Sequence, residues 1–171
     1  MKISALLSAS SLVAFATFGT PIVQVRDLPN APTISIVAWD QGNVDVGLRT
    51  RLRRDGSHLG EGRVGEHRLY LNSVFVEARG GFAHAVAQDG KLLRNTGVEG
   101  DTDACRFNNV CSPAKTIGLG VPDEWLRQHR DSVVVTLRPQ TGQNWTIRLD
   151  RSLIDAYLTT IDSVSAALKK K

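Results

Sequence analysis

The stretch RTRLRR, residues 49–54, places four arginines within six residues. Arg49, Arg51 and Arg53 alternate with uncharged residues, and in a β-strand residues two apart lie on one face, about 6.5–7 Å from each other. A guanidinium group offers a planar fork of N–H donors that fits the oxygens of a carboxylate, sulfate or phosphate group. Guanidinium groups at this spacing therefore predict a site for a ligand that carries repeated anionic groups.

Two further arginines, Arg63 and Arg68, extend this basic strand face if the chain around 44–55 pairs as a hairpin with the chain around 67–78. His67 joins the same surface in that arrangement. We predict that the face binds an anionic glycan or an acidic protein. The alternatives are a solvated sheet face or a charged strand edge that keeps sheets from associating.

The chain contains two cysteines, Cys105 and Cys111, with five residues between them. This spacing matches neither the C-x-x-C redox motif nor the usual zinc half-site, in which two to four residues separate the ligands. Asn108 and Asn109 lie between the cysteines and suit the chain reversal that a bridge requires. We predict a Cys105–Cys111 disulfide that closes a local loop; two free thiols or an intermolecular link are the alternatives.

The first residues of the chain indicate an oxidising compartment, where such a disulfide forms. Lys2 is followed by an apolar run from Ile3 to Ala14, and Ala14 and Ala16 have the spacing of a signal-peptidase site. We predict a signal peptide over 1–16 and a periplasmic or secreted protein. An uncleaved membrane anchor is the alternative. No second long apolar segment follows, so we expect no membrane span in the mature chain.

Charge and composition restrict the class of partner. The 171 residues include 21 lysines and arginines against 17 acidic residues, a net charge of +4, and only 6% of the residues are aromatic. So small a basic excess, with few aromatic side chains for stacking, argues against nucleic-acid binding. The composition does not determine the oligomeric state.

Motifs for catalysis and for metal binding are missing from the sequence. It has no G-x-S-x-G, no H-E-x-x-H and no phosphate-binding glycine loop, and Asp123 and Glu124 are interpreted as charges at a helix start. We therefore predict no catalytic residue, no cofactor and no metal. A hydrolase whose site brings a histidine beside a carboxylate from distant positions is the least favoured alternative. The histidines available to it are scattered: His58, His67, His84 and His129.

From residue 33 onward most segments have the residue pattern of β-strands. These strands would position the arginines and histidines named above. The segment 44–56 alternates, which places Leu48 and Leu52 on the face opposite the arginines. The pair Asp89-Gly90 between two β runs predicts a hairpin. Pro122 followed by two acids predicts a short helix near 122–130.

The C-terminus differs from the rest, because apolar residues recur at helical spacing over 152–168. Ser152 and Asp155 suggest a capping box at the start of this amphipathic helix. The whole pattern predicts a mostly β protein. An extended Pro-rich lead-in over 17–32 precedes one antiparallel β-sandwich or barrel-like domain over 33–171, which includes both helices.

The function that these features predict is that of an exported, non-catalytic binding or adaptor module that recognises an anionic partner. A structural subunit of an envelope or surface assembly is the alternative.

Overall fold

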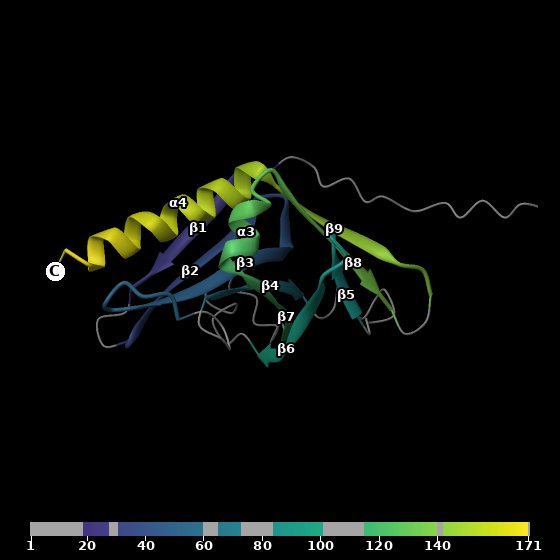
Figure 1. Cartoon of the computed structure of the whole chain (residues 1–171), viewed down its shortest axis with the longest axis horizontal. Helices are drawn as coiled ribbons and strands as arrows, with labels where there is room; N and C mark the ends of the chain where they lie inside the picture. The colour runs from purple at the N-terminus through teal and green to yellow at the C-terminus, as the bar shows by residue number, and fades with distance from the viewer. Residues whose placement is uncertain are drawn as a thin grey trace, which may run out of the picture.

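A computed structural model describes residues 19–27, 31–59, 65–72, 84–100, 115–139 and 142–170. Within these ranges nine strands form a single sheet in the order β1-β2-β3-β4-β7-β6-β5-β8-β9, and every neighbouring pair is antiparallel. The elements, labelled in Figure 1, are β1 (Pro21–Arg26), β2 (Thr33–Asp40), β3 (Asn43–Arg53), β4 (Glu66–Asn72), β5 (His84–Ala87), β6 (Leu92–Gly100), β7 (Lys115–Pro122), α3 (Asp123–Gln128), β8 (Ser132–Arg138), β9 (Trp145–Asp150) and α4 (Arg151–Leu168).

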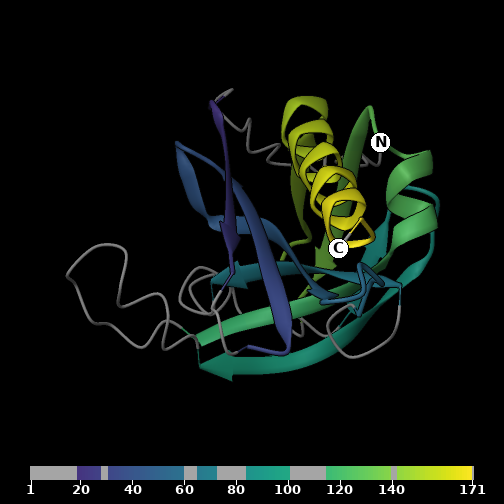
Figure 2. The same ribbon diagram turned by 90° about the vertical axis from the view of Figure 1, so that its left-hand side faces the viewer.

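The sheet curls into a half-barrel whose open side is covered by the helices. Figure 2 shows β1 and β2 on one side of the trough, β8 and β9 on the other, and α4 lying along the mouth. Helix α4 contacts β1, β2, β8 and β9, so it spans both edges of the sheet. The predicted mostly β, barrel-like fold with a short helix and a C-terminal helix is confirmed.

The core lies between the inner face of the sheet and the apolar side of α4. In β2 every second residue is buried, as expected for a strand with one face on a core. Helix α4 presents its buried side chains at helical spacing, because residues three and four apart share one side of a helix. These side chains are Leu153, Ile154, Tyr157, Leu158 and Ile161.

Two features of the chain ends differ from the sequence analysis. Pro21–Arg26, within the predicted lead-in, pairs with β2 and forms an edge strand of the sheet. The predicted capping box is wrong: Asp150 is the N-cap residue of α4, in an extended conformation and without a side-chain capping hydrogen bond. Ser152 lies inside the helix, and Asp155 forms ion pairs with Arg130 and Arg151 instead.

The predicted hairpin at Asp89-Gly90 is confirmed, because β5 and β6 pair as antiparallel strands on either side of it. Gly56 and Gly90, which follow Asp55 and Asp89, have φ values of 78° and 83°, a backbone region that glycine enters without steric cost. The signal peptide over 1–16 and the Cys105–Cys111 pair lie outside the described residues. Among the described helices, none has the length and apolar content needed to cross a membrane.

Leu158→Ala tests the packing of α4 on the sheet. Leu158 is fully buried, so its truncation should lower the free energy of unfolding by about 2–5 kcal/mol through lost apolar contact and a residual cavity. The control is Leu92→Ala, at a position 67% exposed, which should change stability by less than about 0.5 kcal/mol. Urea unfolding followed by circular dichroism measures both, and equal losses in the two variants would contradict this packing.

Candidate functional site

The arginines of β3 lie on the outer face of the sheet, opposite the core. The inner-face residues Leu48, Thr50 and Leu52 are buried, whereas Arg49 and Arg51 are half-buried and Arg53 is exposed. The alternation predicted for this strand is therefore confirmed. Residues directly opposite each other in an antiparallel pair share a face, so the strand register identifies their neighbours.

The predicted pairing of β3 with β4 is also confirmed, and it sets Arg68 directly opposite Arg49. On the other side of β3, Arg51 pairs with Ser35 of β2, which in turn pairs with Arg26 of β1. The register thus brings together four arginines from three strands on one outer face. We call this set, with Arg53, the basic face: Arg26, Arg49, Arg51, Arg53 and Arg68. The fifth predicted site residue, Arg63, lies outside the described residues.

Arg68 lies flat against the neighbouring strand and is only 1% exposed. A Cβ atom at Gly118 of β7 would stand 1.9 Å from Arg68 Nε, so only glycine leaves room for this arginine. Gly120, the residue directly opposite Arg68, separates it from Arg94, which forms an ion pair with Glu66 at 2.5 Å. Arg68 therefore belongs to the buried part of the basic face, and Arg53 to its exposed part.

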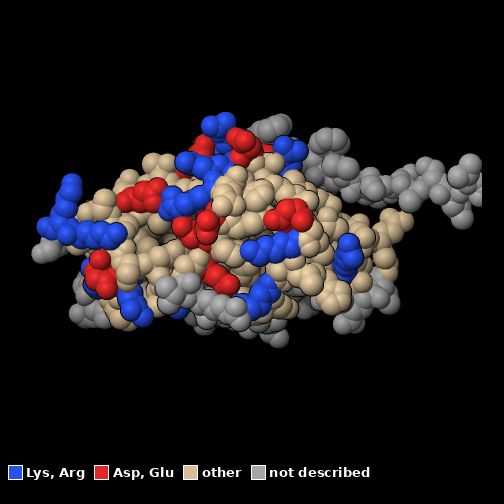
Figure 3. All heavy atoms as spheres, in the orientation of Figure 1, with Lys and Arg blue, Asp and Glu red and all other residues tan. Residues whose placement is uncertain are grey.

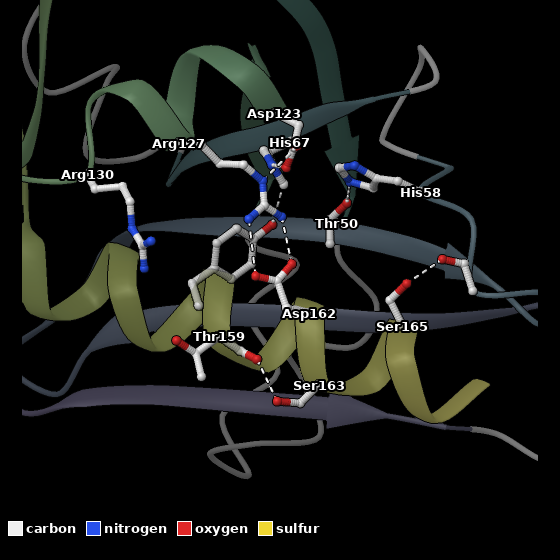
Figure 4. Close-up of polar contacts among 12 residues, drawn as sticks. Thr50, His58, His67, Asp123, Arg127, Arg130, Thr159, Asp162, Ser163 and Ser165 are labelled. Carbon is white, nitrogen blue, oxygen red and sulfur yellow. Dashed lines mark hydrogen bonds and ion pairs between the residues drawn. The ribbon is translucent and has the colours of Figure 1, made fainter. Parts of the chain in front are cut away.

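His67 does not extend the basic face, contrary to the sequence analysis. Side chains alternate along a strand, so the residue before Arg68 points to the inner side, where His67 is fully buried. Figure 4 shows His67 beside Asp123 and facing His58 and Thr50 across the inner surface of the sheet. This group of inward-facing polar side chains is the second candidate site of the molecule.

Both ring nitrogens of His67 have partners. Its Nε2 lies 2.9 Å from Asp123 Oδ1, and its Nδ1 lies 3.1 Å from the Tyr157 hydroxyl. A carboxylate only accepts, so Nε2–H donates to Asp123 and Nδ1 accepts from Tyr157. The ring of His58 lies 4.6 Å from that of His67, and His58 Nε2 contacts the Thr50 hydroxyl. We call His58, His67 and Asp123 the histidine cluster.

Elements far apart in the chain position the histidine cluster. His67 is in β4, Asp123 is the first residue of α3, and Tyr157 is on the buried side of α4. His58 follows the β3 turn and is held by a β-bridge to Leu52. Asp123 begins a helix, as predicted. It also accepts a hydrogen bond from Arg127 Nε at 2.9 Å, and Arg127 donates a further hydrogen bond to Asp162.

Burial and hydrogen bonding set the charges in this cluster. Burial lowers the pKa of His67, and burial together with the neighbouring His67 lowers the pKa of His58 to about 4. The hydrogen bond from His67, followed by that from Arg127, lowers the pKa of Asp123 well below its usual range. At neutral pH the cluster therefore holds two uncharged imidazoles and one carboxylate.

The histidine cluster can bind a ligand or a proton. Each of the three residues offers one nitrogen or oxygen ligand atom, and these atoms all lie within 4.8 Å of one another, a spacing compatible with a metal ion. The neighbouring hydroxyls, on Thr50 and Tyr157, belong to residues with 0% exposure, so neither is placed to attack a substrate. The hydrolase alternative requires a deep pocket that holds a histidine with a carboxylate neighbour, and His67 beside Asp123 supplies the second part of that requirement.

The sequence carried one usable signal for this cluster. His67 shares its strand face with Leu69 and Leu71, which indicates a buried histidine, and a buried histidine needs hydrogen-bond partners. Those partners are 56 and 90 positions away, so no local spacing identifies them.

Acidification should destabilise the protein, because His58 is half-buried and uncharged in the folded state. Its pKa is lowered from 6.5 to about 4, so between these values the unfolded chain binds a proton that the folded chain excludes. Stability should be complete above about pH 6.5 and should fall as the pH decreases toward 4. Urea midpoints at pH 7.5 and 5.0, in metal-free buffer, measure the loss.

His58→Gln should reduce this pH dependence, since glutamine does not titrate. His84→Gln is the matched control, because His84 is an exposed residue of β5. If the two variants lose stability equally between pH 7.5 and 5.0, His58 is not the titrating group.

Comparison with models of protein families, with curated proteins and with solved structures finds no match to this chain in any of the three.

Proposed function

We propose that the protein is an exported binding or adaptor module that recognises an anionic ligand, a glycan or an acidic protein, through the basic face. The observation that carries this proposal is the strand register, which gathers Arg26, Arg49, Arg51 and Arg68 on one outer face with Arg53 beside them. Export rests on the sequence pattern of residues 1–16.

The pairing of like charges supports a role for this face. Arg49 stands directly opposite Arg68, and like charges in that position destabilise a sheet. An anionic ligand at the half-buried Arg49 and Arg51 would reduce this repulsion. Arg26, Arg49, Arg51 and Arg68 already take part in interactions within the molecule, so the ligand adds to or exchanges these contacts. Exposed Arg53 is the position at which a ligand first meets the face.

The opposite side of the molecule has a different charge pattern. Figure 3 shows the side bearing α3 and α4, where cationic and anionic side chains are interspersed. Ion pairs account for much of this pattern, among them Arg127 with Asp162 and Arg130 with Asp155. A large anionic ligand would meet mixed charges there, which favours the outer face of the sheet as the binding surface.

Arg51→Gln combined with Arg53→Gln tests the proposal without touching buried Arg68. Retention on immobilised heparin and on immobilised poly-glutamate, eluted with NaCl, distinguishes a sulfated glycan from a carboxylate chain. The double variant should bind the preferred matrix about 2- to 30-fold more weakly, since each exposed ion pair contributes about 0.2–1 kcal/mol.

The matched control is Arg138→Gln combined with Arg148→Gln, which removes the same charge from exposed positions on β8 and β9 at the other edge of the sheet. This control should elute with the unmodified protein. Equal weakening in both double variants would show that net charge alone causes retention, and the basic face would then not be the site.

A further inference from the structure

We propose that the histidine cluster is a binding site for a first-row divalent transition-metal ion, with zinc as the best fit. Its ligands are one ring nitrogen each of His58 and His67 and a carboxylate oxygen of Asp123, which already lie within 4.8 Å of one another. The sequence analysis predicted no metal, because these ligands come from the turn after β3, from β4 and from α3.

The set of donors fits zinc chemically. Two imidazoles and one carboxylate are ligands that zinc accepts in open sites, where a water molecule or another small ligand completes the tetrahedron. Calcium and magnesium prefer sites made of oxygen atoms alone, so two imidazoles argue against them. The cluster contributes one negative charge, from Asp123, against the two positive charges of the ion.

Each ligand has a neighbour that holds it in place, as is usual around protein-bound metals. With the ion on His67 Nε2, the proton moves to Nδ1, and Nδ1–H then donates to the Tyr157 oxygen at the observed 3.1 Å. Thr50 contacts His58 Nε2, and when that nitrogen carries the proton, Nδ1 has the free lone pair. Arg127 Nε holds Oδ2 of Asp123, which leaves Oδ1 for the ion.

The placement of the site separates it from the basic face. His67 and Thr50 are on the inner side of β4 and β3, and the arginines are on the outer side. His58 is half-buried, whereas His67 is fully buried, so the ion approaches from the side of His58. A bound ion would connect the turn after β3 to β4 and α3.

Titration of the full-length protein with ZnCl2, after removal of metals with EDTA, tests the site by calorimetry. The unmodified protein should bind one equivalent. His58→Gln should raise the Kd by at least about 100-fold, because loss of a neighbour that only orients a ligand already costs 10–100-fold. His84→Gln and His129→Gln, at histidines outside the cluster, should bind as the unmodified protein does.

Reduced cysteines can also bind zinc, so Cys105→Ser combined with Cys111→Ser is tested as well and should retain the site. Ring ¹⁵N spectra of the unmodified protein provide a readout that needs no substitution: zinc should shift the signals of two of the four imidazoles, those of His58 and His67. The proposal is overturned if no equivalent of zinc binds, if binding is lost in the cysteine variant, or if His58→Gln binds unchanged.

Discussion

The hydrogen bonds of His67 tie the sheet to both helices. A fully buried imidazole needs a partner for each ring nitrogen, since an unpaired buried polar group costs about 1–3 kcal/mol. Asp123 supplies one partner from the start of α3, and Tyr157 supplies the other from the middle of α4. These two bonds add directional contacts to the apolar packing of α4 and link the start of α3 and the middle of α4 to the same residue of β4.

Alternation along two strands divides the chemistry of the molecule between two surfaces. Arg68 and His67 are neighbours in the sequence, yet one lies on the outer face and the other in the core. The outer face gathers the cationic side chains of the basic face, whereas the inner face gathers two uncharged imidazoles and one carboxylate whose ligand atoms lie within 4.8 Å of one another. A single sheet thus keeps the arginines of the basic face apart from the buried histidine cluster.

Local sequence patterns predicted the strands and helices, but they did not predict contacts between residues far apart in the sequence. The alternation around Leu48 and the apolar spacing around Leu158 identified β3 and α4, because burial of one face imposes a period on the sequence. The start of α4 was misplaced, since Asp150 adopts the N-cap conformation without the side-chain bond that a capping motif implies. The histidine cluster was not predicted, because its three residues are far apart in the sequence and are neighbours only in the folded structure.

Helix α4 also has a consequence for the order in which the protein forms. The last element of the chain covers the inner side of β1 and β2, which are made first, and it packs on β8 and β9 as well. A nascent chain that lacks Arg151–Leu168 leaves the inner side of its early strands open to water. Stable folding of the sheet must therefore wait until α4 has been made and has packed on these strands.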